Sequence, residues 1–321
     1  MGCGYRHTYT RTPFLPLKRE GVKLKKSALH PKSGTILAYM LPTFLIYTFV
    51  VIVPIISAIR LSFYNWSGGK KITYIGLNNY VALLKDNVFW QSFRNNITIT
   101  VLCFIGQIGL AFILASFLQT RMIKWKSFHR IVAYFPATIS AVVVGFVWSF
   151  VYNYDYGLIN TVLGILNLSK WAKPWLDNPD SIMYAVSIHI IWQYIGFYMV
   201  IILAAMASIE KSIYEMAEID GASGFQKAIS ITLPMIKNTL AVTVMLCISG
   251  NMKIFDHIYT MTGGGPGNSS MVMALDVYKT TFIKSQYGYA SAMSVGILVL
   301  SMLLIFITRI PTMSWRKESD D

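Results

Sequence analysis

The chain has 321 residues, of which 55% are hydrophobic and 13% are charged. A soluble domain of this size could not bury so large an apolar fraction in one core, so the composition excludes an ordinary soluble protein and indicates one solvated by lipid. The formal net charge of +14 does not require a nucleic-acid partner, because cationic loops on one side of a membrane and their attraction to anionic headgroups account for most of it.

Six apolar stretches are long enough to cross a hydrocarbon layer of about 30 Å as helices. They are continuous runs rather than short alternating segments, which favours helices over a barrel. The first run is too long and begins too late for a cleaved signal peptide, so we expect it to remain as a span. The predicted spans are residues 35–63, 92–118, 131–152, 182–208, 236–255 and 289–308. The chain is therefore expected to be an all-α membrane protein with a transmembrane domain over residues 35–308.

The distribution of lysine and arginine predicts the orientation of these spans. Cations gather in the N-terminal tail 1–34, in the loop after the second span and in the C-terminal tail 309–321. The loops at 64–91, 153–181 and 256–288 mix lysine with aspartate and are rich in glycine, asparagine and tyrosine. Because cytoplasmic loops carry the excess of cations, both termini are predicted to be cytoplasmic.

The connection between the fourth and fifth predicted spans, residues 209–235, is longer and more polar than a simple turn would need. Ser212, with Glu215 three residues on, could form a capping box at the start of a short helix that ends at Gly221. Residues 225–231 suit a second short helix, and Pro234 is expected at the start of the next span, where its missing N–H costs little. The alternative is an interfacial amphipathic linker that lies on the headgroups.

The spacing of residues in this connection resembles a known motif. Glu215-Met216-Ala217, then Gly221 after three residues, then Ile231-Thr232-Leu233-Pro234 after nine more is similar to the EAA loop (E-A-A-x3-G-x9-I-x-L-P) of the membrane subunits of binding-protein-dependent ATP-binding-cassette importers. Met216 replaces the usual alanine and keeps helix propensity. In that family the loop is a coupling helix that seats in a cytoplasmic ATPase. The resemblance implies that the ATPase-coupling residues are Glu215, Ala217, Asp220, Gly221, Ala222, Ile231 and Pro234.

Further short motifs extend the resemblance to the carbohydrate-importing branch, the maltose-type and multiple-sugar permeases. They follow the order and topological positions of that branch from the first outer loop to the sixth span. They are SFYNW (62–66), YIGLNNY (74–80), FPATISAVVVGFVW (135–148), YGLIN (156–160), IYTMTGGGPGNSS (258–270) and YGYASAMSV (287–295). Each is weak alone, and the six in order indicate a sugar importer.

The resemblance also implies a fold, partners and a location. The fold would be that of a type I importer permease, in the cytoplasmic membrane of a bacterium. The chain would form half of the translocation pathway, in a heterodimer with a second permease, two copies of a cytoplasmic ATPase and an extracytoplasmic solute-binding protein. ATP and Mg²⁺ would be bound by the ATPase subunits, so this chain would hold no cofactor and would not be an enzyme by itself.

Polar side chains inside spans are costly and usually face a cavity or another helix. The candidates are Gln107, Gln193, Asn251 and Lys253, with Trp192, Tyr194 and Phe255 as aromatic neighbours. In the family, sugar contacts come from around the fourth to sixth spans, which favours Trp192, Gln193 and Asn251 as the substrate pathway. The alternative is that glutamine and asparagine only join helices. Lys253 is expected to snorkel or to pair with Asp256.

Other chemistries find little support in the sequence. The five histidines are scattered, and Cys103 and Cys247 are predicted to be small core residues, so no metal site is expected. Two alternative functions remain open. One is a permease of the same class for another solute such as a glycerol phosphodiester, for which arginine near the pathway would be expected. The other is a secondary transporter, for which inverted repeats or mid-membrane ionisable residues would be expected.

Overall fold

The computed structural model describes residues 33–120 and 123–317, and it describes side chains up to residue 308. Most of the predicted basic N-terminal tail and Cys3 lie outside the described residues. The chain divides into two units, residues 1–54 and 55–321. The first unit contains α1 (Ser33–Tyr47), the π-helical segment η2 (Thr48–Ile52) and the start of α2 (Val53–Leu61). Together they form an apolar helix over Gly34–Leu61 that is long enough to cross a membrane.

Three more helices in the described part of the chain are long and apolar enough to be spans: Asn87–Gln119, Pro179–Ala207 and Tyr287–Thr308. The first consists of α4 (Asn87–Cys103), the π-helical η3 (Phe104–Gly109) and α5 (Leu110–Gln119). The others are α9 (Pro179–Ala207) and α16 (Tyr287–Lys317). All four spans overlap predicted ones. Helix α4 begins before the predicted start because the Asp86 side chain accepts hydrogen bonds from the N–H groups of Val88 and Phe89.

The third predicted span, 131–152, is broken into two helices in the structure. Helices α6 (Lys126–Tyr134) and η4 (Phe135–Thr138) are followed by α7 (Ala141–Val151), and the chain bends by 96° between them. Pro136 lies in the short 3-10 segment, and Ile139 and Ser140 are extended rather than helical. The apolar run continues through the break, so composition alone could not reveal it.

The fifth predicted span, 236–255, corresponds to one helix that is joined at a sharp bend to a helical segment before it. A helical segment, Gly224–Met235, contains α11 (Gly224–Gln226), the π-helical η6 (Lys227–Thr232) and α12 (Leu233–Met235), and it meets α13 (Lys237–Met252) at 77°. Pro234 therefore lies at the end of the preceding helix rather than at the start of the span, which corrects the prediction. If each bent pair is one span, the described residues hold up to six spans.

A small hairpin joins two of the sequence motifs. Strands β1 (Tyr64–Trp66) and β2 (Ile72–Tyr74) pair antiparallel, with Tyr64 opposite Tyr74. After β2, α3 (Asn78–Lys85) returns, and Asn79 Nδ2 donates to the carbonyls of Ser62 and Tyr64. The SFYNW and YIGLNNY motifs thus hold each other in place.

Short helical segments lie in the remaining connections between the spans. Helix α8 (Leu158–Ile165) and η5 (Ser169–Trp171) lie between α7 and α9. Helices α14 (Asp256–Met261) and α15 (Met273–Tyr278), with the π-helical η7 (Lys279–Ile283), lie between α13 and α16. The glycine-rich loop after α14 is held by Asn95 of α4, whose Nδ2 donates to the carbonyls of Asn268, Ser269 and Met271.

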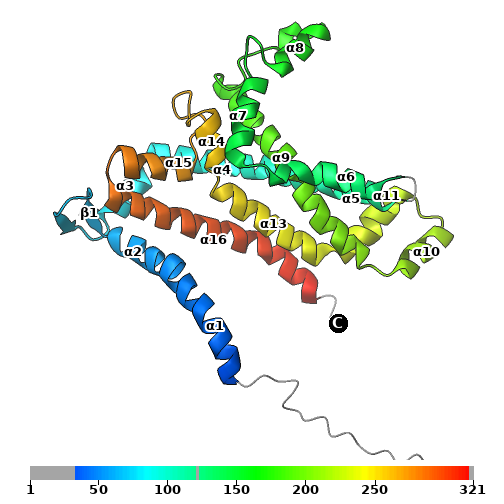
Figure 1. The fold of residues 1–321 in the computed structure, drawn as a ribbon, viewed down its shortest axis with the longest axis horizontal. Helices are drawn as coiled ribbons and strands as arrows, with labels where there is room; N and C mark the ends of the chain where they lie inside the picture. The colour runs from blue at the N-terminus through cyan, green and yellow to red at the C-terminus, as the bar shows by residue number, and fades with distance from the viewer. Residues whose placement is uncertain (1–32, 121–122, 318–321) are drawn as a thin grey trace, which may run out of the picture. The chain divides into compact units, whose positions relative to one another are not determined.

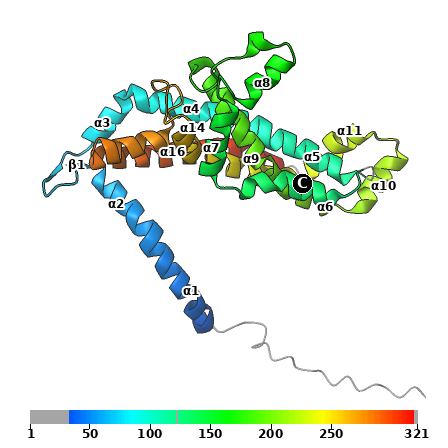
Figure 2. The same ribbon diagram turned by 45° about the horizontal axis from the view of Figure 1, so that its top comes forward.

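Helix α9 is the centre of the second unit. It packs against α4, η3, α5 and α6, and its buried residues include Ile190, Met199 and Ile202. Cys103 and Cys247 are fully buried in the same core, as predicted. Figures 1 and 2 both show α10 (Lys211–Ile219) and α11 at one end of this unit and β1 and α3 at the other. The polar connection and the hairpin of strands thus lie at opposite ends.

Candidate functional site

The polar connection folds as a helical hairpin, defined here as α10 and the helical segment Gly224–Met235. Its corner is made by two capping motifs. The N–H of Ala222 bonds to the carbonyl of Ala217, the N–H of Gly221 bonds to that of Glu218, and Gly221 has a φ of +74°. This is the Schellman arrangement, which a residue without a Cβ adopts most readily. Gly221 therefore ends the helix, as predicted from the sequence.

A capping box starts the second helix of the hairpin instead of the first. The Gln226 N–H donates to Ser223 Oγ at 3.2 Å, and the Ser223 N–H donates to Gln226 Oε1 at 2.8 Å. The predicted capping box at Ser212 is wrong, because the N-cap of α10 is Glu210, two residues earlier, and this position has no side-chain cap. Ser212 with Glu215 and Ser223 with Gln226 both have the spacing of a capping box. Only Ser223 has the extended backbone that an N-cap residue adopts.

Side chains also join the two helices of the hairpin. Lys227 Nζ lies 3.0 Å from Glu218 Oε1, and the Tyr214 hydroxyl lies 3.0 Å from Thr232 Oγ1. Within α10, Lys211 pairs with Glu215 at 2.7 Å. Exposed ion pairs contribute little singly, but caps, ion pair and hydrogen bond together hold the two helices in one geometry.

The predicted coupling residues lie on different parts of this hairpin. Glu215, Asp220, Gly221 and Pro234 are exposed, Ala222 and Ile231 are half-buried, and Ala217 is buried. The sequence analysis missed an apolar tip, which we define as Met216, Ile219 and Phe225. Ile219 is 84% exposed and Phe225 is 77% exposed. Large apolar side chains in such positions favour contact with a partner or with lipid.

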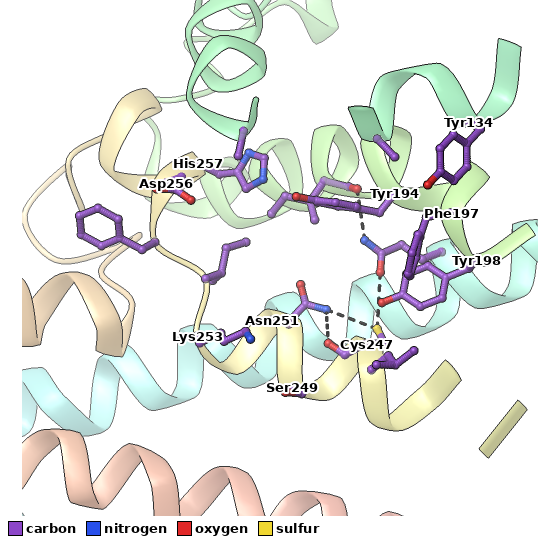
Figure 3. A pocket seen from close by; sticks show the side chains of 18 residues that line it. Tyr134, Tyr194, Phe197, Tyr198, Cys247, Ser249, Asn251, Lys253, Asp256 and His257 are labelled. Carbon is purple, nitrogen blue, oxygen red and sulfur yellow. Dashed lines mark hydrogen bonds between the residues drawn. The ribbon is translucent and has the colours of Figure 1, made fainter. Parts of the chain in front are cut away.

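A cavity of about 610 Å³ lies between α9, α13 and α14, with α6 and η3 at its edge (Figure 3). Its aromatic lining is Tyr134, Tyr194, Phe197, Tyr198 and Phe255. Its polar lining includes Gln107, Ser249, Asn251, Lys253, Asp256 and His257. Cavities that bind small molecules combine apolar and aromatic walls with a few polar groups in this way.

Hydrogen bonds fix the amides on the cavity wall. Gln107 Nε2 donates to the Ile190 carbonyl at 3.2 Å, and Cys247 Sγ lies 3.5 Å from Gln107 Oε1. Asn251 Nδ2 donates to the Cys247 carbonyl at 2.9 Å, and Asn96 Nδ2 donates to the Asn251 carbonyl at 2.8 Å. The amides therefore have a defined orientation before any solute binds.

The three residues predicted for the substrate pathway do not come together. Asn251 lines the cavity, whereas Trp192 and Gln193 are absent from its lining. Trp192 makes an edge contact with Trp148 at 5.5 Å between ring centroids. Gln193 is fully buried, and its Nε2 donates to the carbonyl of Ile139 in the α6–α7 break at 3.0 Å. Gln193 thus supports the bend, which is the helix-joining alternative weighed for such residues.

Lys253 and Asp256 both line the cavity, and no ion pair joins them in the described part of the chain. Of the two roles expected for Lys253, the ion pair with Asp256 is therefore not formed among the described residues, and snorkelling stays a prediction. They flank the break at which α13 ends and α14 begins. Ionisable groups on a cavity wall in a membrane protein favour a role in solute passage.

The sequence analysis did not select Gln107 or Tyr194 for the pathway, although both were among its polar and aromatic candidates. It missed His257 entirely, because the wall brings together residues from 107 to 257 that no local spacing connects. Within residues 33–120 and 123–317, no group of three or more histidine, cysteine or acidic side chains could hold a metal ion.

These features define a multi-pass membrane protein with a cavity lined by aromatic and polar side chains, and membrane components of transport systems belong to this class. The chain belongs to the family described as "Binding-protein-dependent transport system inner membrane component", whose model matches residues 107–312. This match spans the cavity, the hairpin and the last span. The resemblance to membrane subunits of binding-protein-dependent importers, predicted from the sequence, is confirmed.

Several curated relatives and a solved structure are similar over most of the chain. A probable ABC transporter permease protein, YurN of Bacillus subtilis, is 34% identical, covering 81% of this chain and 90% of the relative. The probable starch degradation products transport system permease protein AmyD of Thermoanaerobacterium thermosulfurigenes is 30% identical, covering 84% and 92%. The trehalose/maltose transport system permease protein MalF of Thermococcus litoralis is 30% identical, covering 84% and 90%. A chain of a bacterial ABC transporter for import of the acidic polysaccharide alginate shares the fold, with a TM-score of 0.76, 22% identity and coverage of 88% and 96%.

Proposed function

We propose that this chain is a membrane-spanning subunit of an ATP-driven importer, and that the solute it passes is a sugar or oligosaccharide delivered by a binding protein. The observation that carries the proposal is the cavity, in a chain of the binding-protein-dependent family. Relatives named for starch products, trehalose or maltose support the choice of solute.

The cavity chemistry suits a carbohydrate. Tyrosine and phenylalanine rings can cover the C–H-rich faces of a pyranose, and amide and hydroxyl groups can bond its hydroxyls. Tyr194 and Asn251 lie on opposite sides of the space in Figure 3, so a ring could lie between them. Among the described lining residues Lys253 and Asp256 bring one charge of each sign, which suits a neutral solute better than a phosphodiester.

The helical hairpin would transmit ATP-driven movement. Its apolar tip would seat in a cleft of a cytoplasmic ATPase, and Glu215 and Asp220 would set the register of that contact. The capped corner and the cross-links between Lys227 and Glu218 and between Tyr214 and Thr232 support a rigid-body role, because force transfer needs an element that does not deform.

The whole transporter would contain a second permease subunit, an ATPase dimer that binds ATP and Mg²⁺, and an extracytoplasmic binding protein. The hairpin and both termini would face the cytoplasm of a bacterium. This chain would form half of the pathway and would hydrolyse no ATP itself. ATP binding would open the cavity outward, and hydrolysis would reset it.

The test is sugar uptake and ATPase activity of the complete complex in proteoliposomes, with labelled maltose, lactose and diacetylchitobiose as probes. The wild-type complex should hydrolyse ATP faster with sugar-loaded binding protein. Glu215→Lys and Gly221→Asp should each lose at least about tenfold of that stimulation, since charge reversal or an added carboxylate at a docking contact costs about 1.4 kcal/mol or more.

Two matched variants separate docking from folding. Lys211→Met breaks the same ion pair as Glu215→Lys but leaves the carboxylate, and Gly221→Asn adds a side chain tolerated at positive φ without a charge. Both should keep most of the stimulation. A wild-type complex that transports none of the sugars, or docking variants stimulated as well as wild type, would contradict the proposal.

A further inference from the structure

Two histidines that lie 68 residues apart in the sequence meet inside the second unit. His189 Nε2 lies 3.0 Å from His257 Nδ1, and the ring centroids are 4.9 Å apart. His189 is fully buried, and His257 is 3% exposed. No described carboxylate forms an ion pair with either ring.

The pair connects the central helix to the cavity wall. His189 lies in α9, and His257 lies in α14 and lines the cavity. Helix α14 follows the break at Lys253 to Phe255, so the backbone hydrogen bonds of α13 do not extend into it. Its position must come from side-chain packing, to which the histidine pair contributes a directional bond.

The surroundings of the pair are mostly aromatic. Trp148 of α7 lies 6.0 Å from His189 and Tyr194 of α9 lies 6.2 Å from His257, between ring centroids. His257 Nε2 has no hydrogen-bond partner among the described residues. The titratable and charged groups near the pair on the packed elements include Tyr152 directly after α7, Tyr194 and Tyr198 of α9, Lys253 directly after α13 and Asp256 of α14. None of them is bonded to either ring.

The hydrogen bond depends on the protonation state of the two rings. A neutral imidazole has one N–H and one acceptor nitrogen, so the bond needs an acceptor on at least one ring. If both rings are protonated, two donors and two positive charges face each other at 3.0 Å in a buried site. Burial lowers the pKa of His257 to about 4, so the neutral ring is favoured while α14 stays in place.

We propose that the His189–His257 pair positions the outer wall of the cavity and releases α14 when both rings are protonated, so that solute passage falls on acidification of the binding-protein side. The inference rests on the proposed import function for its transport readout. The histidines act here as positioning residues, through α14.

The sign of the pH effect follows from linkage. A histidine with a pKa near 6.5 when released and about 4 in place binds a proton more tightly when released. The neutral histidine pair therefore stabilises the arrangement in which α14 is held against α9 above about pH 6.5. This stabilisation is lost as the pH falls towards about 4.

The test uses a pair of variants that keeps a hydrogen bond but cannot titrate. Glutamine places an amide near the Nε2 position of histidine and asparagine places one near Nδ1, so the double variant H189Q/H257N can bond in the same direction. For each protein in the full complex we compare uptake of labelled sugar at about pH 5 with uptake at about pH 7.5, varying only the pH on the binding-protein side. The result for each protein is the ratio of its uptake at the two pH values, so differences in expression or basal activity cancel.

The ratio of uptake at about pH 5 to uptake at about pH 7.5 should be lower for wild type than for the double variant by about fivefold or more, because about pH 5 lies about 1.5 units below the free pKa of histidine and the protonated, released form is favoured there. His129→Gln, at an exposed histidine bonded only within its own helix, should follow the wild type. Equal pH profiles of wild type and double variant would overturn the proposal.

A second measurement does not depend on transport. The melting temperature of the purified complex should fall between about pH 6.5 and pH 4.5 more steeply for wild type than for the double variant. If the wild type transports no sugar at any pH, the proposed function fails and the melting profiles still decide the role of the pair. Parallel melting profiles would contradict that role.

Discussion

The helical hairpin and the cavity are built in opposite ways. The hairpin is made from one continuous stretch of sequence, it is held by local caps and two cross-links, and its apolar tip is exposed. The cavity is made from seven separate helical segments. The Gln107 amide on its wall bonds the Ile190 carbonyl of α9, and the Asn251 amide bonds the Cys247 carbonyl one turn earlier in α13. The hairpin therefore leaves apolar side chains exposed, whereas the cavity wall is part of the helix packing itself.

This difference predicts how each region responds to substitution. If the proposed coupling role is correct, a change at the exposed hairpin tip removes a contact with the ATPase and leaves the chain folded. A change in the cavity wall disturbs solute contacts and helix packing together, because the same side chains serve both. The substitutions below therefore measure function and folding stability separately. The comparison fails if a change in one region has the effect expected of the other.

The largest effect is expected where α9 supports the cavity wall. A Cβ added at Gly196 would overlap the backbone of Ala133 and lie 2.7 Å from Tyr134 Cα. Gly196→Ala must push α6 away from α9, and we expect a loss near the upper end for single substitutions, about 3–5 kcal/mol. Yield of monodisperse complex and its melting temperature measure this loss.

The matched control for Gly196 is Gly109→Ala. Gly109 is also a glycine within a span, and a Cβ there meets nothing within 4 Å. It should fold as wild type. Normal yield and melting temperature for Gly196→Ala would show that α6 and α9 are not packed as closely as described.

The smallest effect is expected at Asp276, which belongs to neither region. It is 3% exposed in α15, and its Oδ2 has no hydrogen-bond partner among the described residues. Burial raises the pKa of this carboxyl to about 6; Lys284 and Lys279 act in the opposite direction and Asp86 adds to the rise. The folded protein thus holds this proton more tightly than the unfolded chain, and stability falls as the pH rises from about 4 to about 6.

Asp276→Asn removes the buried charge and should raise the melting temperature at about pH 7.5 by about 2–4 °C, with the gain shrinking towards zero near pH 4. Thermal melts of wild type and variant across this range measure the difference. An unchanged or lower melting temperature at neutral pH would contradict the burial of an unpaired carboxylate. Sugar uptake and ATPase stimulation should stay as in wild type.

The sequence predicted the hairpin better than the cavity, for a physical reason. Helix caps and loop motifs depend on residues a few positions apart, so Gly221 could be identified as a helix end from its neighbours alone. The competing caps at Ser212 and Ser223 have the same spacing signature, and only the backbone decides between them. The four unbroken spans were predicted from length and apolar character, which is all that lipid solvation requires.

The bends and the cavity were outside the reach of sequence reasoning. The break at Ile139 and Ser140 lies within an apolar run. Hydropathy reports how apolar a segment is and does not reveal where the helix axis bends. Gln193 was expected at the pathway because it is polar within a span, yet it bonds the carbonyl of Ile139. His189 and His257 meet only because α14 turns back onto α9, a contact that no spacing encodes.

The most direct test of the account compares the two regions in one assay, the number of sugar molecules imported per ATP hydrolysed. The double variant Ile219→Asp with Phe225→Asp charges the exposed tip, and Asn251→Ala removes an amide from the cavity wall. Ile219→Leu, which keeps the tip apolar, is the control. All four proteins, including wild type, are reconstituted with the ATPase and the loaded binding protein.

The account predicts that the tip variant loses stimulated ATPase activity and uptake together, by about tenfold or more, because contact with the ATPase is lost. Asn251→Ala should keep the stimulation and import fewer sugar molecules per ATP, and Ile219→Leu should match wild type. A tip variant with normal stimulation, or an Asn251→Ala variant with the wild-type ratio, would contradict the assignment of coupling to the hairpin and of passage to the cavity.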